Sequence, residues 1–387
     1  MNDFAALGAK IKAADGPGEA IKAFLRQAVE KKVADAVLVP VKVPAGNSYA
    51  WILVTDMSIL DDASPVAPVM PVQGAKALKS LTRKGHGELT VMAVMRPCEI
   101  RATFELLKLN QVNLEKVVLV SYDCPGAIPF RDYVKDPGFG EKNFQAVMAA
   151  GGPAEKNVKP ACVICDEFSR VDSDIHFGWF GESGSSVLVI PSSDRGVEVL
   201  GSMGMECSDD IAGWKKTISG LKEKKTGKRT ATLTETAKTI QGLDGLLGTF
   251  SECIGCHNCM AVCPICYCRQ CYFDSEVAKK TPDFILETAK KRGGLAFPSD
   301  RVMFHTGRMT HMSLSCVSCG MCTDACPVDI HVAEVFSYMA DITQPAFEYT
   351  AGRNDGVPLP LRKYEEKEVP QVHEIVKEAE GEEAAHE

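Results

Sequence analysis

Two segments of the 387-residue chain repeat one cysteine pattern, and this repeat constrains the fold more than any other feature. In each segment, three cysteines separated by two residues are followed, three residues later, by a fourth cysteine and a proline: Cys253, Cys256, Cys259, Cys263 and Pro264, then Cys316, Cys319, Cys322, Cys326 and Pro327. In bacterial ferredoxins this spacing wraps three thiolates around one 4Fe–4S cluster and directs the fourth to the other cluster. We therefore predict two 4Fe–4S clusters, one bound by Cys253, Cys256, Cys259 and Cys326, the other by Cys316, Cys319, Cys322 and Cys263.

The total of 16 cysteines is also compatible with a disulfide framework or with zinc sites. The N-terminal residues lack the basic and apolar regions of a signal peptide, and no apolar run reaches the length of a membrane span. We therefore expect a cytoplasmic chain without a membrane span, in which the thiols stay reduced. Paired cysteines recur in zinc ribbons, but two complete motifs that each end in Cys-Pro favour iron–sulfur clusters.

Charge and composition exclude other classes of protein. Lys and Arg total 43 against 51 for Asp and Glu, which gives a net charge of −8, so no nucleic-acid partner is expected. The chain is 45% hydrophobic and 24% charged, which is ordinary for a globular protein of two or three domains. From Glu365 onward nine Glu and two Lys predict an acidic, disordered tail.

The first 200 residues alternate between apolar strands and helices. Strands are predicted over residues 36–43, 50–55, 89–95 and 117–122, and helices over 74–84 and 99–110. This alternation predicts an α/β domain whose sheet is at least partly parallel. Cys98 and Cys124 then directly follow strands, where open α/β sheets place their ligand sites.

The chain divides into four parts on these patterns. They are an α/β domain (1–205), a helical linker (206–250), a two-cluster ferredoxin-like domain (251–345) and an extended acidic tail (346–387). The linker carries seven Lys or Arg and one Glu between Lys215 and Arg229, which favours a solvated helix face over a docking patch. A long insert separates the two ferredoxin motifs, with helices predicted over 283–292 and 308–315.

Eight cysteines lie outside the ferredoxin motifs. Cys98, Cys124, Cys162 and Cys165 come from three loops that could converge on one more cluster, although single buried cysteines are common in protein cores. Cys207 stands alone, and three more follow the first motif: Cys266, Cys268 and Cys271. These three could ligate another metal, replace a ligand in the pairing above, or pack beside the clusters as small apolar residues, and packing is favoured.

Longer stretches resemble the beta subunits of formate dehydrogenases and hydrogenases that use the deazaflavin coenzyme F420. The resemblance covers most of the chain and is carried by Pro97-Cys98 with the helix after it, Cys124, the run from Cys162 to Phe168, the run from Asp174 to Gly181, and the segments Cys263-Pro-Ile-Cys266-Tyr-Cys268-Arg-Gln-Cys271 and His311-Met-Ser-Leu-Ser-Cys316. The C-terminal ferredoxin pair makes the formate dehydrogenase subunit the better match.

The resemblance implies that the α/β domain binds FAD beside a 4Fe–4S cluster held by Cys98, Cys124, Cys162 and Cys165. Gly16 and Gly18 match the glycine-rich helix start of that family, where backbone N–H groups could receive a phosphate. Pro17 removes one of these donors, and a plain helix start is the alternative. Gly178 and Gly181 would let the backbone approach a flat ring, or would serve as turn glycines.

The function implied by the resemblance is electron transfer within an oxidoreductase complex. A flavin exchanges electrons in pairs or singly, whereas iron–sulfur clusters carry them singly. The expected partners are a formate dehydrogenase or hydrogenase catalytic subunit, a hydride carrier such as F420, and a ferredoxin or a heterodisulfide-reductase-like flavoprotein. Formate chemistry is expected in the catalytic subunit, at a pterin cofactor, so no catalytic residue is assigned to this chain.

An alternative function keeps the clusters but not the flavin. In this case the chain is an iron–sulfur adaptor that links a dehydrogenase or hydrogenase to a heterodisulfide-reductase-like complex, and Cys98 and Cys124 are core thiols. A separate NAD site is disfavoured because the chain has no GxGxxG fingerprint.

Overall fold

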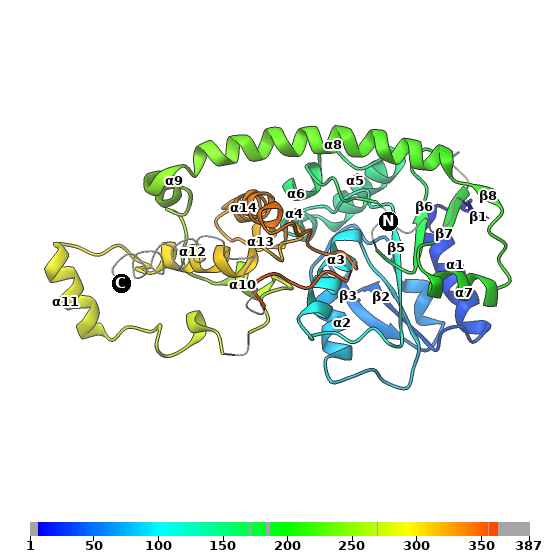
Figure 1. The fold of residues 1–387 in the computed structure, drawn as a ribbon, viewed down its shortest axis with the longest axis horizontal. Helices are drawn as coiled ribbons and strands as arrows, with labels where there is room; N and C mark the ends of the chain where they lie inside the picture. Colours follow the sequence, from blue (N-terminus) through cyan, green and yellow to red (C-terminus); the bar gives the residue numbers. More distant parts are fainter. Residues whose placement is uncertain (1–6, 170–171, 183–185, 269, 355, 363–387) are drawn as a thin grey trace, which may run out of the picture.

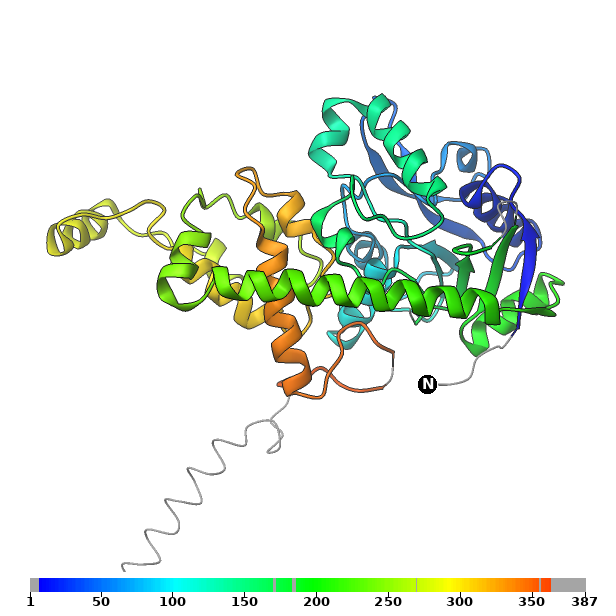
Figure 2. The same cartoon turned by 90° about the horizontal axis from the view of Figure 1, so that it is seen from above.

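A computed structural model describes residues 7–169, 172–182, 186–268, 270–354 and 356–362. A sheet with its helices forms one part, and a mostly helical part with the ferredoxin motifs lies beside it (Figure 1). Helix α8 (Ala212–Thr239) runs along both parts and is the longest element of the described chain (Figure 2). With 28 residues it extends for about 42 Å.

The sheet has eight strands in the order β3-β2-β4-β5-β6-β7-β1-β8. Their bounds are β1 (Leu7–Lys12), β2 (Ala36–Lys42), β3 (Tyr49–Val54), β4 (Val91–Val94), β5 (Val117–Tyr122), β6 (Ile175–Gly178), β7 (Ser186–Pro191) and β8 (Asp209–Asp210). The central strands β2, β4, β5 and β6 are parallel, and the flanking pairs are antiparallel. The predicted partly parallel sheet is confirmed.

Eight elements complete the α/β part on either side of this sheet. They are α1 (Pro17–Glu30), η1 (Ile59–Asp62), α2 (Gly74–Thr82), α3 (Pro97–Lys108), α4 (Phe130–Lys135), α5 (Pro137–Ala149), α6 (Pro160–Val163) and α7 (Asp194–Ser202). Strands β4 and β5 are buried along their whole length, as expected of parallel strands covered on both faces.

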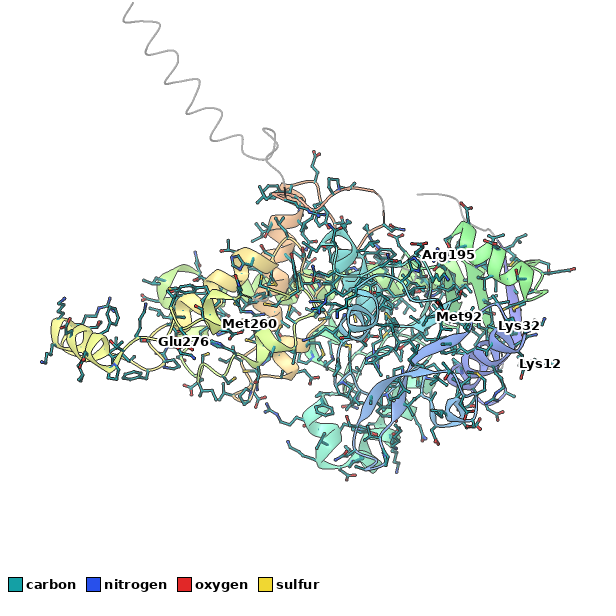
Figure 3. All side chains as sticks on the ribbon, turned by 90° about the horizontal axis from the view of Figure 1, so that it is seen from below. Lys12, Lys32, Met92, Arg195, Met260 and Glu276 are labelled. Carbon is teal, nitrogen blue, oxygen red and sulfur yellow. The ribbon has the colours of Figure 1, made fainter. Side chains whose placement is uncertain are left out.

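Alternate residues of the central strands contribute to two hydrophobic cores. On β4, Met92 packs in a core with Phe24 of α1, and Ala93 packs in a second core with Ile100 of α3. The second core continues into the ferredoxin part, where it includes Phe336. Met92 and Met260 mark the two parts in Figure 3. The two parts therefore share this second core and are not joined by a linker alone.

The ferredoxin part consists of short helices around the two motifs and of longer helices outside them. Their bounds are α9 (Gly242–Thr249), α10 (Asn258–Ala261), η2 (Tyr272–Asp274), α11 (Pro282–Arg292), α12 (Arg301–Met312), α13 (Met321–Asp324) and α14 (Val332–Ala346). The helix predicted over 283–292 is confirmed as α11. The helix predicted over 308–315 is α12, which begins seven residues earlier and ends three residues earlier than expected.

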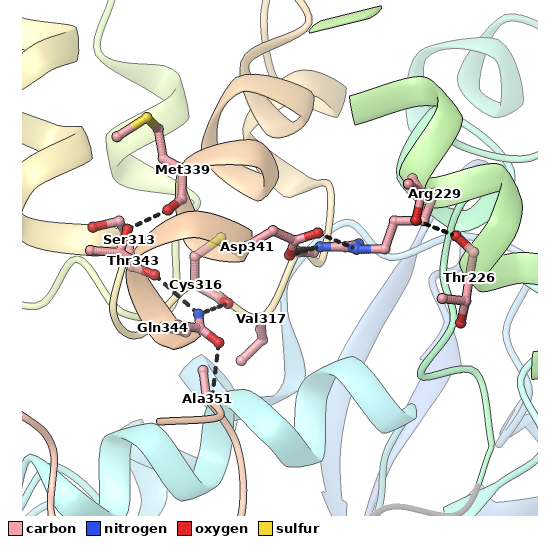
Figure 4. A network of polar contacts seen from close by, with 12 residues as sticks. Thr226, Arg229, Ser313, Cys316, Val317, Met339, Asp341, Thr343, Gln344 and Ala351 are labelled. Carbon is pink, nitrogen blue, oxygen red and sulfur yellow. Dashed lines mark hydrogen bonds and ion pairs between the residues drawn. The ribbon is translucent and has the colours of Figure 1, made fainter. Parts of the chain in front are cut away.

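The basic stretch of the linker is only partly a solvated face: Lys216, Lys222 and Lys224 are exposed as expected, but the expectation fails for Lys225. Lys225 of α8 is 3% exposed, and its Nζ donates to the carbonyl oxygens of Ala154 and Val163 at 2.6 and 2.9 Å. Arg229, one turn further on, pairs with Asp341 of α14 at 2.6 Å (Figure 4). Lys225 and Arg229 thus hold α8 to both parts of the same chain.

The expected C-terminal tail also begins later than predicted. After α14, Tyr349 and Ala351 are buried against α3, and Gln344 of α14 accepts a hydrogen bond from the Ala351 amide (Figure 4). Glu105 of α3 accepts from the Tyr349 hydroxyl at 2.6 Å and from the amide of Gly352 at 2.7 Å. The predicted acidic tail from residue 365 lies outside the described residues. Within the described ranges, we find no helix with the length and hydropathy needed to cross a bilayer.

Candidate iron–sulfur centres

The four scattered cysteines of the α/β part line one cavity. Cys98 is the second residue of α3, Cys124 follows β5, and Cys162 and Cys165 lie in and just after α6. All four border the same empty space of about 460 Å³, part of which is open to solvent. We call this set the α/β centre. It lies where the neighbouring strands β4 and β5 end, at the edge where parallel sheets place their ligands.

Buried cations accompany the α/β centre. Arg96, which is 4% exposed, directs Nη1 to within 3.9 Å of the Cys124 sulfur, and Lys159, which is 1% exposed, lines the same cavity. Burial raises the pKa of the Cys98 thiol well above its ordinary value and that of Cys165 to about 12. Thiols that are this far removed from water become thiolates only with strong positive compensation, and iron supplies it on binding.

The second motif and the last cysteine of the first motif surround another cavity. Cys263, Cys316, Cys319 and Cys322 border an empty space of about 440 Å³, part of which is open to solvent, and we call this set the proximal ferredoxin centre. Burial raises the pKa of Cys319 to about 12, and the neighbouring Cys263 thiol is the second largest cause of this increase. The geometry therefore brings Cys263 to the three cysteines of the other motif, in the predicted crossed arrangement.

The remaining four ferredoxin cysteines form the distal ferredoxin centre. Cys259 lies within electrostatic range of Cys253, Cys256 and Cys326, and burial together with these neighbours raises its pKa to about 11, although the nearby Arg308 guanidinium lowers it. Cys256 is exposed, whereas Cys259 and Cys326 are buried. This centre thus has one edge near the protein surface.

The α/β centre and the proximal ferredoxin centre adjoin each other. Cys319 borders both cavities, as does its neighbour Ser318. Gly320 has φ +76°, and a Cβ at this position would lie only 2.5 Å from the Cβ of Ala161 in α6, so only glycine permits this approach of the ferredoxin loop. Lys159 lies at the same junction, with Nζ 3.9 Å from Asp324 of α13. The three centres therefore follow one another from the sheet to the distal end.

The arrangement fits a multi-iron group better than a single metal ion. Among the residues that the structure describes, no group of three or more His, Cys, Asp or Glu side chains is placed to hold one ion. At the α/β and proximal centres, four sulfurs instead surround an empty space. Four thiols around one space match in number the four irons of a 4Fe–4S cluster, each of which takes one thiolate.

The surplus cysteines lie outside these three sets. Cys266 is within electrostatic range of Cys263, Cys268 and Cys271, and burial raises its pKa to about 11. Cys268 is exposed, and the Cys271 sulfur lies 3.8 Å from the Met260 sulfur. Cys207 packs at the border of the α/β core, where burial raises its pKa. The packing role predicted for the three cysteines agrees with the contacts of Cys266 and Cys271 with the second core, but not with the exposure of Cys268.

The four candidate flavin-binding glycines have different surroundings. Gly16 (φ +95°) precedes α1 and Gly18 lies in its first turn, and a Cβ at either position would meet nothing within 4 Å. At Gly178 a Cβ would lie 2.7 Å from the Trp214 ring nitrogen, and at Gly181 (φ +81°) 2.6 Å from the Thr217 hydroxyl. The structure thus gives Gly178 and Gly181 a packing role against α8, whereas the space beside Gly16 and Gly18 is open.

Several charged or polar residues near the sulfurs were not predicted from the sequence. Arg308 of α12 donates from Nη1 to the Cys259 sulfur at 3.1 Å, and Nε2 of His305 lies 3.4 Å from the Cys253 sulfur. Burial and Arg308 lower the pKa of His305 to about 4. The spacing of three residues on one helix was the available signal, but the sequence did not show which face of α12 meets the motifs.

Comparison with known proteins supports this description. Residues 249–330 match the 4Fe-4S dicluster domain family. The chain is 24% identical over 379 residues to the F420-dependent formate dehydrogenase subunit beta of Methanocaldococcus jannaschii. This alignment covers 88% of this chain and 93% of the relative. It is 25% identical over 388 residues to the F420-dependent formate dehydrogenase 1 subunit beta of Methanococcus maripaludis, and this alignment covers 89% of this chain and 93% of the relative.

A solved structure, described as a xenon derivatization of the F420-reducing [NiFe] hydrogenase complex from Methanosarcina barkeri, contains a similar chain. The similarity covers 63% of this chain and 97% of that one, with 17% identity and a TM-score of 0.45. The resemblance inferred from the motifs is confirmed by the curated relatives: over nearly nine-tenths of its length, the chain is similar to the beta subunits of F420-dependent formate dehydrogenases.

Proposed function

We propose that this chain is the electron-transfer subunit of an F420-dependent formate dehydrogenase or hydrogenase complex, and that it carries FAD and three 4Fe–4S clusters. Electrons would pass between a hydride carrier at the α/β part and a catalytic subunit that contacts the distal end. Formate chemistry would take place in that catalytic subunit. The observation that carries this proposal is the row of three thiol sets, in which Cys319 borders the first two cavities.

The α/β part has a narrow, aromatic-lined pocket next to the α/β centre, and we place the flavin ring there. It is lined by Tyr49, Trp51, Arg96 and Tyr122, among others, and its volume is about 10 Å³, so a flavin ring would enter only after these walls move apart. It shares Arg96 with the cavity of the α/β centre, so the two spaces meet at this guanidinium. Aromatic walls with one buried cation suit a flat, partly polar ring. The four predicted glycines do not line this cavity, and Gly16 and Gly18 stay candidates for the phosphates.

The residues of this junction have clear chemical roles in the proposal. A bound flavin would accept a hydride and release its electrons singly to a cluster. Arg96 can stabilise negative charge on either side, because its guanidinium also donates to the backbone carbonyls of Ala67 and Val69 and is held in place by them. Its position is set further by Glu99, whose carboxylate accepts from the Arg96 amide at 2.9 Å.

The distal end offers a surface for a partner subunit. Large apolar side chains are exposed there, including Leu243 (66%), Ile254 (57%), Phe297 (65%) and Met303 (51%). Ile254 and Phe297 border a groove that also reaches Cys253 of the distal centre. Apolar surface beside a redox centre suits a protein partner that receives electrons at close range. We expect Ile254→Glu to keep full iron content but to reduce co-purification of the catalytic subunit.

The test is iron and flavin quantitation on the anaerobically purified chain and its complex, followed by reduction with F420H2. About twelve irons and one FAD per chain are expected, with flavin and clusters reduced by the carrier. About eight irons without FAD would favour the flavin-free adaptor instead. Iron and FAD without reduction by F420H2 would keep the electron-transfer role and reject the carrier.

A further inference from the structure

Arg308 lies between the two ferredoxin centres. Its Nη1 donates to the sulfur of Cys259 and its Nη2 to the carbonyl oxygen of the same residue, both at 3.1 Å. The same side chain lines the cavity of the proximal centre, within electrostatic range of Cys263 and Cys322. One guanidinium therefore faces ligands of both predicted clusters.

The charge of Arg308 is buried without a carboxylate partner. The residue is 2% exposed, and its guanidinium stacks over the ring of Phe336 at 4.8 Å. In the described ranges of the chain no Asp or Glu forms an ion pair with it, and its Nε has no hydrogen-bond partner. A buried cation of this kind is costly unless negative charge lies close by. Here the groups placed to supply that charge are the cysteine sulfurs.

Lys159, at the other junction, provides a contrast. It is equally buried, but the Asp324 carboxylate lies 3.9 Å from its Nζ and offsets its positive charge. Lys159 therefore has a counter-ion within the protein, whereas Arg308 depends on the clusters. Arg308 is also a guanidinium, which stays positively charged under all physiological conditions.

We infer that Arg308 is the shared counter-charge of the proximal and distal clusters and sets their reduction potentials, an inference that rests on the cluster relay proposed above. A cluster that accepts one electron becomes more negative by one charge, and no bond to Arg308 forms or breaks. A fixed positive charge and an N–H···S bond both stabilise the reduced form, which raises the potential. Because the direct hydrogen bond is to Cys259, the effect is larger at the distal cluster.

The experiment is a redox titration of the full-length protein, followed by electron paramagnetic resonance, with iron analysis of every sample. Arg308→Met removes the charge at similar length, and Arg308→Lys keeps the charge but not the paired donors. Arg292→Met, which removes one exposed charge from α11, is the matched control. Cys256→Ala, which removes the exposed distal ligand, identifies the distal signal.

Arg308→Met is expected to make reduction of the distal cluster at least tenfold less favourable, which is 59 mV for one electron. The proximal cluster should shift less in the same direction, Arg308→Lys should give a smaller shift than Arg308→Met, and Arg292→Met should give none. Unchanged potentials in an iron-replete Arg308→Met protein would overturn the inference. Loss of both clusters from both Arg308 variants would also overturn it, since Arg308 would then be purely structural.

The wild-type protein separates this inference from the proposed function. If it binds no clusters in the ferredoxin part, the relay itself is wrong. If it binds them and their potentials do not respond to Arg308, the relay stands and only the role of Arg308 is refuted.

Discussion

Arg101→Met is expected to loosen the contact between the α/β part and the ferredoxin part. Arg101 of α3 is only 9% exposed, and its guanidinium donates twice to the carbonyl oxygen of Ala351, at 3.0 and 3.3 Å. It donates once more, at 3.3 Å, to the carbonyl oxygen of Val317, which lies between two ligands of the proximal centre. One side chain on the helix of Cys98 thus holds both the C-terminal segment and a cluster loop.

The size of the effect follows from the two carbonyl groups that lose their donor. A hydrogen bond from a charged group contributes about 1.5–3 kcal/mol, and the lower value applies here because two of the three contacts are long. Two acceptors then amount to about 3 kcal/mol. If the free energy required for local opening falls by this amount, amide exchange in the affected segments becomes roughly 100-fold faster.

Hydrogen–deuterium exchange with mass spectrometry measures this change directly. The informative amides are those of Ala351 and Gly352, which donate to Gln344 and Glu105 in the native structure. Arg353→Met is the matched control, because Arg353 makes one partly exposed ion pair with Glu167, for which less than about 1 kcal/mol is expected. Unchanged exchange around Ala351 and Val317 in Arg101→Met would refute the reasoning, as would an equal effect of Arg353→Met.

Three further predictions test the centres and the fold. Replacing Cys162 and Cys165 together with Ala should remove about four irons and leave the ferredoxin pair, whereas Cys207→Ala should remove none; full iron in the double variant would reject the α/β cluster. Cys326→Ala should damage the distal cluster, and loss of the proximal signal alone would show that the crossed pairing is wrong. Burial raises the pKa of Glu141, but hydrogen bonds from Lys42 and two tyrosines lower it overall, so its stabilising effect is present near neutral pH and is lost as the pH falls through the lowered pKa. Glu141→Gln should therefore cost about 1–2 kcal/mol near pH 7, and circular dichroism melting should show a smaller difference from the wild type once the pH falls below the ordinary Glu pKa of about 4.3.

Much of the secondary structure was predictable because it depends on local patterns. The strand predicted over 117–122 matches β5, and the helix predicted over 283–292 differs from α11 by one residue. The apolar runs and the Pro and Gly residues at their ends specify these elements without help from distant parts. The start of α12 was missed because its first two turns pack with Phe250 and His257, contacts that a local pattern does not reveal.

The role of the basic stretch on α8 was not predictable for a similar reason. Seven positive charges in a helix usually indicate contact with water. Lys225 is buried instead because two backbone carbonyls, from Ala154 and Val163, accept from its ammonium group. These carbonyls belong to a loop about 70 residues away and to the end of α6 about 60 residues away, which only the folded chain brings beside α8.

The cysteine spacing by itself determined the ferredoxin character of residues 249–330, because ligands two or three residues apart reach one cluster through local loop geometry. It could not show that Cys98, Cys124, Cys162 and Cys165 meet, since that depends on the parallel pairing of β4 and β5 and on the approach of α6. Nor could it place Arg308 between two centres. Tertiary structure decided both, because a cavity and an uncompensated buried charge arise only when segments distant in the chain pack together.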